Sequence, residues 1–242
     1  MFSIFVKEIN SFFNSLIAYL VILMFLTFVG LYLWVLPESS VLSFGYADID
    51  PLFQYGPMAF LLLIPAITMR TFSEEKKDGT IELLLTRPLT DWQIILGKYF
   101  ASFVLVLLSL LPTLVYYFSV YQLGNPVGNI DSAAVGSSYV GLGLLGATFC
   151  AIGIFASIIT KNQVVAFMVC VIICYVLLDG IGRLATVNLW GQWASIFSIL
   201  GMDYHYQSLS KGMIDSRDVI YFLSIITIML VAAQKILGSR KW

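Results

Sequence analysis

Six long apolar runs constrain the fold of this chain more than any other feature of its sequence. They cover residues 16–36, 52–69, 94–120, 139–159, 164–182 and 219–237. Because a helix rises about 1.5 Å per residue, about 20 apolar residues cross a hydrocarbon core about 30 Å thick. We therefore predict an all-α polytopic membrane protein with six transmembrane helices, in which residues 1–242 form a single transmembrane domain.

Composition excludes the other broad classes. Apolar residues make up 60% of the chain and charged residues 11%, against about 45–50% and about 25% in a soluble domain. A membrane β-barrel would alternate apolar and polar residues in place of the continuous runs. The formal net charge of -1 gives no basic surface, so we expect no nucleic-acid partner. The first run is longer than the roughly 7–15 residues of a signal-peptide core, so we expect it to remain a span.

The distribution of Lys and Arg predicts the orientation. Loops on the cytoplasmic side of a membrane protein carry an excess of these residues. On the side of the two termini lie Lys7, Arg70, Lys76, Lys77, Arg87, Lys98, Lys161, Lys235, Arg240 and Lys241. The opposite side has Arg183, Lys211 and Arg217. We therefore predict that both termini are cytoplasmic.

The segment before the first span has the pattern of an amphipathic helix. Apolar residues recur at helical spacing, while polar residues such as Lys7 and Asn10 point elsewhere; the apolar set is Phe5, Ile9, Phe12, Phe13 and Leu16. Such a helix lies in the membrane interface, in contact with lipid. We expect an N-terminal interfacial helix over residues 2–14. The alternative is that this segment continues the first span inward.

The chain lacks the chemistry of an ATPase or of a membrane enzyme. It has no G-x-x-x-x-G-K-[ST] phosphate loop, and its longest polar segments, 70–93 and 183–218, are too short for a nucleotide-binding domain. Energy must therefore come from another chain or an ion gradient, and we expect no cofactor or metal in this chain. His205 is the only histidine, and beside two tyrosines we interpret it as an interfacial surface residue. Asp179 marks the outer end of the fifth span, with Arg183 as its partner.

Small residues crowd the fourth span: Gly141, Gly143, Gly146, Gly153, Ala147, Ala151 and Ala156. Close helix packing is the simpler explanation, because small residues let helix backbones approach one another in lipid. A conduit or a contact between protomers is the alternative. Cys150, Cys170 and Cys174 lie inside apolar runs and are interpreted as packing residues.

The segment between the second and third spans carries several helix start and stop signals, which a simple loop would lack. Helix can continue through residues 73–78 to Gly79, which is suited to a left-handed stop. A short helix then fits residues 80–86, since Ile81, Leu84 and Leu85 share a face. Thr90 and Gln93 have the spacing of a capping box. The surrounding charges are mixed in sign: Glu74, Glu75, Lys76, Lys77, Asp78, Glu82, Arg87 and Asp91. Lipid-surface helices tend to be basic, so a protein partner is favoured.

Residues 74–98, which read EEKKDGTIELLLTRPLTDWQIILGK, resemble the signature of ABC-2 type transporter permeases. Residues 205–222, HYQSLSKGMIDSRDVIYF, resemble the passage that leads into that family's sixth helix. The resemblance implies that the short helix is a cytoplasmic coupling helix. Ile81, Leu84 and Leu85 would then dock on an ATPase, with Glu82 and Arg87 at the rim and Glu74, Glu75, Lys76 and Lys77 close by.

The resemblance also implies partners and a location. It implies a permease dimer, with itself or a related subunit, in the bacterial inner membrane, carrying two cytoplasmic ABC ATPase subunits that bind ATP and Mg. The outer segment 186–206 would dip partly into the membrane as short helices. Within the family, the chain is most similar to the permease subunit of gliding-motility ABC transporters. That complex would include a second membrane subunit with a periplasmic part.

We therefore expect the chain to be the transmembrane half of an ATP-driven exporter. The alternative is a membrane anchor that transmits an ATP-driven shape change to other envelope components and moves no substrate. A membrane enzyme is the weakest hypothesis, because the spans lack paired polar groups.

Overall fold

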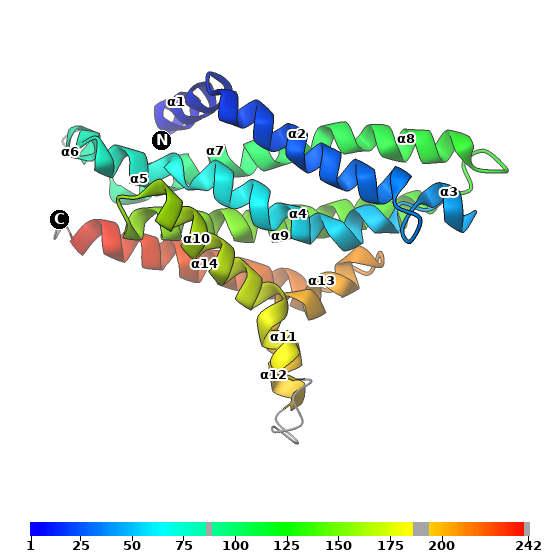
Figure 1. Ribbon diagram of the computed structural model, residues 1–242. Helices are drawn as coiled ribbons and strands as arrows, with labels where there is room; N and C mark the ends of the chain where they lie inside the picture. The colour runs from blue at the N-terminus through cyan, green and yellow to red at the C-terminus, as the bar shows by residue number, and fades with distance from the viewer. Residues whose placement is uncertain (86–88, 186–193, 240–242) are drawn as a thin grey trace.

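The computed structural model describes residues 1–85, 89–185 and 194–239 (Figure 1). All regular structure within them is helical. Six helical segments are long and apolar enough to cross a membrane, which confirms the predicted number of spans: Leu16–Val35, Asp50–Lys77, Asp91–Leu123, Ser132–Ile159, Gln163–Leu184 and Ser216–Ser239.

Several spans are built from consecutive helices. Turns of π-helix or 3-10 helix join some of the pieces, one of them at Pro112, where the missing N–H interrupts the α-helical ladder. The α-helices are α1 (Phe2–Phe13), α2 (Leu16–Gly30), α3 (Val41–Phe44), α4 (Asp50–Thr68), α5 (Arg70–Lys77), α6 (Thr80–Leu85), α7 (Asp91–Leu110), α8 (Leu114–Leu123), α9 (Ser132–Ile159), α10 (Gln163–Tyr175), α11 (Ile181–Leu184), α12 (Ala194–Leu200), α13 (Met202–Ser210) and α14 (Ser216–Ser239).

Helix α9 lies at the centre of the bundle and packs against α4, α7, α10, α13 and α14. Its glycines permit these approaches. A Cβ atom at Gly153 would lie 2.0 Å from Oγ1 of Thr68, and one at Gly141 would lie 2.7 Å from Cβ of Leu209. Gly143 is different, because a Cβ there would meet nothing within 4 Å. The packing interpretation is therefore confirmed for Gly141 and Gly153.

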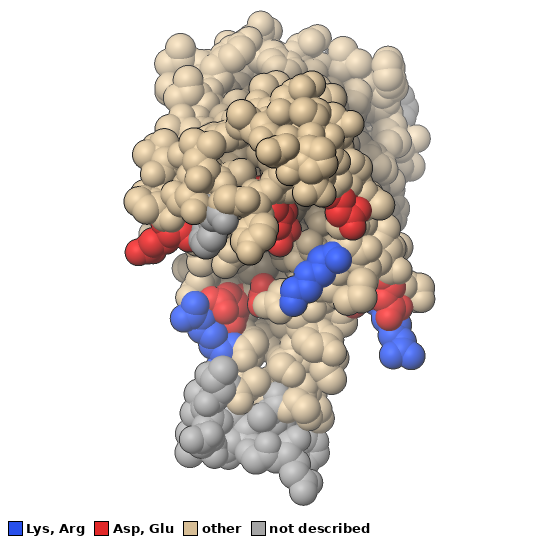
Figure 2. Space-filling view, turned by 90° about the vertical axis from the view of Figure 1, so that its right-hand side faces the viewer, with Lys and Arg blue, Asp and Glu red and all other residues tan. Residues whose placement is uncertain are grey.

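The bundle has two distinct ends. Helices α1, α5 and α6 gather at the end where the C-terminal end of α14 also lies, whereas α3 and α13 lie at the opposite end (Figure 1). Seen from that opposite end, acidic and basic side chains form a band across the middle (Figure 2). A groove of about 500 Å³ opens there, with Asp50, Asp203 and Lys211 among its lining residues.

Two single-residue interpretations at this end have different outcomes. Asp179 binds Arg183 across one helical turn, with Oδ2 2.6 Å from Nε, which confirms the predicted pair. The placement of His205 on the surface was wrong. His205 is only 8% exposed, because α12, α13 and α14 surround its ring.

The outer segment is partly described. Helices α11 and α12 project away from the bundle, and α13 returns to it (Figure 1). The predicted short helices thus appear as α12 and α13, whereas Leu189, Trp190 and Trp193 lie outside the described residues.

Candidate functional site at the end that carries the termini

The polar segment after the second span has the predicted local structure. Helix α5 ends at Lys77, and Gly79 follows with φ of 70°, in the left-handed region that glycine adopts without strain. Helix α6 begins directly afterwards and packs against α5. The predicted capping box of Thr90 and Gln93 is present at the start of α7.

A serine from α9 braces the break between α4 and α5. Oγ of Ser157 accepts hydrogen bonds from the backbone N–H groups of Phe72, at 2.9 Å, and Ser73, at 3.1 Å. It also donates to the carbonyl of Met69, at 3.2 Å. The first turn of a helix leaves such N–H groups without partners inside the helix. One hydroxyl therefore caps α5 and ties it to the centre of the bundle.

Lys76 is also turned toward the bundle. The sequence placed it among the charges near a partner, but it is buried, and its Nζ donates to the carbonyl of Ile158. Lys77, the next residue, is exposed. Lys76 is buried because the face of α5 that carries it packs on α9.

Lys98 is the centre of a buried charge cluster. Its side chain is 0% exposed, and its Nζ lies 2.7 Å from Oε1 of Glu8 and 3.0 Å from Oε2 of Glu75. The ammonium also stands 4.8 Å from the ring centroid of Phe72. Glu75, which the resemblance places near an ATPase, therefore has a role inside this chain. Its carboxylate faces inward and joins α5 to α7.

Lys7 completes the cluster from α1, with Nζ 2.8 Å from Oε1 of Glu75. Partial burial would lower the pKa of Lys7, but the hydrogen bond and the charge of Glu75 outweigh it and raise this pKa. Two lysines thus face two glutamates, and the cluster is balanced in charge. It connects α1, α5 and α7.

Helix α1 is separate from the first span. Ser15 caps α2, with its Oγ accepting from the N–H of Ile17 at 3.3 Å, and α1 packs on α7. Ile4 of α1 is buried at this contact. A Cβ at Gly97 of α7 would lie 3.2 Å from the Cβ of Ile4. The alternative of a single continuous first helix is therefore excluded.

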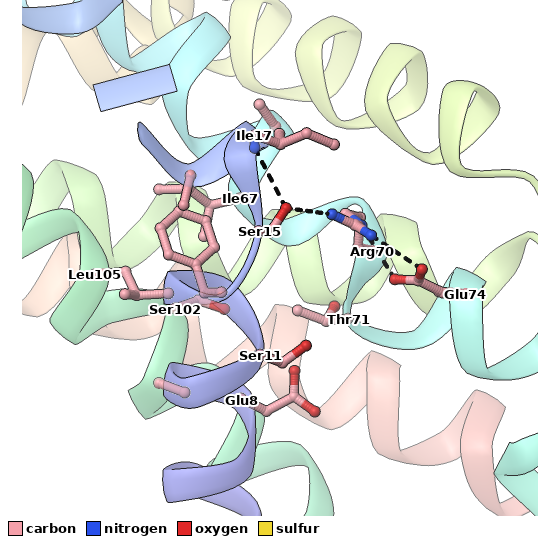
Figure 3. A pocket seen from close by; sticks show the side chains of 14 residues that line it. Glu8, Ser11, Ser15, Ile17, Ile67, Arg70, Thr71, Glu74, Ser102 and Leu105 are labelled. Carbon is pink, nitrogen blue, oxygen red and sulfur yellow. Dashed lines mark hydrogen bonds and ion pairs between the residues drawn. The ribbon is translucent and has the colours of Figure 1, made fainter. Parts of the chain in front are cut away.

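A cavity of about 60 Å³ lies between α1, α4, α5 and α7 (Figure 3). Arg70 closes one side through hydrogen bonds to Ser15, at 3.0 Å, and to both carboxylate oxygens of Glu74, at 3.1 Å. Glu8 and Ser11 point toward the same space. Because a water needs about 10–15 Å³ of such space, this volume is sufficient for a few waters.

Among the described side chains of α6, that of Ile81 belongs to the core. Ile81 is 6% exposed, whereas Glu82 is exposed. In this conformation Ile81 is not free for a partner, because the turn at Gly79 places α6 against α5. The side chains of Leu84 and Leu85, and all of Arg87, lie outside the described part of the chain.

Sequence reasoning missed Glu8 and Ser157, and it counted Lys98 only among the basic residues on the side of the termini. A signal existed for Glu8, because Lys7 and Glu8 are the two charged residues in the sequence of α1. None existed for Ser157, since serine inside a membrane helix commonly bonds to its own backbone. Among the described residues, no group of three or more potential ligands could hold a metal ion.

No individually curated protein matches the chain. A family model described as "ABC-2 family transporter protein" matches residues 3–238. The match covers nearly the entire chain, including the charge cluster and all six candidate spans. The chain therefore belongs to the ABC-2 family of transporter proteins.

Proposed function

We propose that this chain is the permease subunit of an exporter-type ABC transporter and that α6 is its contact with the ATPase. Membership of the ABC-2 family makes the chain a membrane permease component that works with a cytoplasmic ABC ATPase and does not itself hydrolyse ATP. In this proposal the partner binds ATP and Mg. The end with α1, α5 and α6 is cytoplasmic, and the membrane is the bacterial inner membrane.

The observation that carries the proposal is the path from α6 into the bundle. Helix α6 packs on α5, and α5 is tied to α9 through Ser157 and to α7 through Glu75 and Lys98. Helix α1 joins through Glu8 and Lys7. Buried charge pairs and close packing resist deformation better than exposed loops do. A displacement of α6 by a partner would therefore reach α5 and, through it, α1, α7 and α9.

The test replaces the apolar residues proposed to dock. Burying one leucine contributes about 1.5–3 kcal/mol, and each 1.4 kcal/mol is about tenfold in affinity. We expect Leu84→Glu/Leu85→Glu to weaken copurification of the ATPase in mild detergent by about tenfold or more. Glu82→Ala is the matched control, because Glu82 is exposed on the same helix. An unchanged yield of ATPase with the double variant, at normal membrane insertion, would refute the proposed contact.

The finer assignment is that the complex serves gliding motility. It is supported by the overall resemblance of the sequence to the permease subunits of gliding-motility ABC transporters. It predicts copurification of a second membrane subunit with a periplasmic part, beside a dimer of this chain or of this chain with a related one. Purification without such a subunit would contradict the assignment. Reconstitution in liposomes tests export itself, since a purely mechanical anchor would hydrolyse ATP without moving a solute.

A further inference from the structure

His205 lies in the first half of α13, in a buried position between α12 and α14. Both of its ring nitrogens face oxygen atoms. Nδ1 lies 2.7 Å from Oδ1 of Asp218 in α14, and Nε2 lies 2.9 Å from the carbonyl oxygen of Ile199 in α12. The ring therefore bridges two helices that are not adjacent in the sequence.

Counting protons defines the state of this ring. A neutral imidazole has one N–H, and its other nitrogen can only accept. A carbonyl oxygen cannot donate, so Nε2 must carry a proton to bind Ile199. The contact between Nδ1 and Asp218 then needs a second proton. That proton belongs on the imidazole, because an imidazole nitrogen is a stronger base than a carboxylate oxygen.

We propose that His205 and Asp218 form a buried proton-binding site whose proton latches α12 to the bundle. Loss of the proton leaves one N–H for two acceptors. The carboxylate is the stronger acceptor because it is charged. The contact with Ile199 is therefore the one released, and α12 loses a point of attachment.

The position of α12 gives the latch its leverage. Helices α11 and α12 project away from the bundle (Figure 1). The last two carbonyls of α12 form hydrogen bonds with the bundle. That of Ile199 accepts from His205, and that of Leu200 accepts from the hydroxyl of Tyr221, at 2.6 Å. A cation near the C-terminal end of a helix is favourable, because the carbonyls there carry partial negative charge.

The surroundings of the ring hold one compensating charge. Asp218 supplies it from α14, and the ring of Tyr221 stacks on the imidazole with centroids 4.0 Å apart. Tyr204 stands edge-on at 5.3 Å. Asp203, two residues before His205, accepts a hydrogen bond from Gln207 at 2.6 Å, and Arg217 is exposed. The other elements that pack on α13 carry three charged residues: Asp179 in the turn Val176–Gly180 and Arg183 in α11, which pair with each other, and Asp50 in α4. None of the three is recorded in contact with the ring among the described residues.

The first test reads the proton directly. The full chain is labelled with ¹⁵N-histidine, purified without a histidine tag and placed in lipid nanodiscs. Because His205 is the only histidine in the sequence, the nitrogen spectrum then reports a single imidazole ring. At neutral pH, where a free imidazole is mostly neutral, we expect both ring nitrogens to be protonated. We expect Asp218→Asn to convert the ring to the neutral form. A neutral ring in the unmodified chain at neutral pH would overturn the proposal.

The second test reads the latch. Spin labels at positions 196 in α12 and 220 in α14, both exposed, report their separation by pulsed electron resonance, in a background without the native cysteines. We expect a narrow distribution at neutral pH that broadens at alkaline pH and with Asp218→Asn. His205→Gln is the matched control, since its amide can still reach Ile199, whereas His205→Asn cannot. Identical distributions in the unmodified chain across pH would refute the latch without use of any variant, and neither test depends on the proposed ATPase contact.

Discussion

Lys98 keeps two carboxylates, those of Glu8 and Glu75, inside the protein. Lys98→Met preserves much of the apolar volume of the side chain but leaves both carboxylates without their buried cation. Removing one partner of a buried ion pair costs about 3–5 kcal/mol. We therefore expect this variant to lower the midpoint of thermal unfolding in detergent.

Lys7→Met is the matched control, because Lys7 pairs with the same Glu75 but its side chain is 58% exposed. Exposed pairs contribute about 0–1 kcal/mol, so we expect little change in the midpoint. If the two variants lower the unfolding midpoint equally, the buried position of Lys98 does not make its ion pairs more stabilising than the ion pair of Lys7.

Two glycines of α9 differ in the space around them, and this makes the packing of the central helix testable. A Cβ at Gly153 would clash with Thr68, which belongs to α4. Forcing extra atoms into a packed contact costs about 1–3 kcal/mol. We expect Gly153→Ala to destabilise the protein and to weaken the contact between α4 and α9, measured as a lower unfolding midpoint and faster proteolysis.

Gly143→Ala changes the same residue type in the same helix but adds its methyl group where nothing lies within 4 Å. Alanine favours helix over glycine by about 1 kcal/mol, so we expect unchanged or slightly raised stability. A larger loss with Gly143→Ala than with Gly153→Ala would contradict the close approach of α4 to α9.

For the protein as a whole, the orientation in the membrane is the property that the proposed function needs. Six spans place both termini on one side, and the excess of Lys and Arg predicts that this side is the cytoplasm. Single cysteines at positions 43 and 127 should react with a membrane-impermeant reagent in intact cells. A cysteine at position 77 should react only after permeabilisation.

All three of these positions are exposed in the structure, so accessibility within the protein does not bias the comparison. Position 127 is preferred to its neighbour 128 for the cysteine. Gly128 has φ of 85°, and a Cβ there would lie 2.9 Å from the hydroxyl oxygen of Tyr121. Labelling of position 77 in intact cells would show that the orientation is the opposite of the predicted one. Helix α6 would then lie outside the reach of a cytoplasmic ATPase.

The sequence by itself determined the features that depend on length or on neighbours along the chain. Run length defined the six spans, because a membrane of fixed thickness requires a fixed number of helical residues. The glycine stop at Gly79, the capping box of Thr90 and Gln93, and the pair of Asp179 and Arg183 were also predictable. Each involves residues no more than four positions apart, whose spacing alone brings them together in a helix.

Only the tertiary structure decided which distant residues meet. Lys98 and Glu8 lie 90 positions apart, and Ser157 lies 85 positions from Phe72. His205 and Asp218, 13 positions apart, meet because α13 packs beside α14. In a soluble helix the apolar face identifies the core. In a membrane protein the faces toward lipid and toward other helices are both apolar, so the pattern does not reveal which side of each span faces its neighbours.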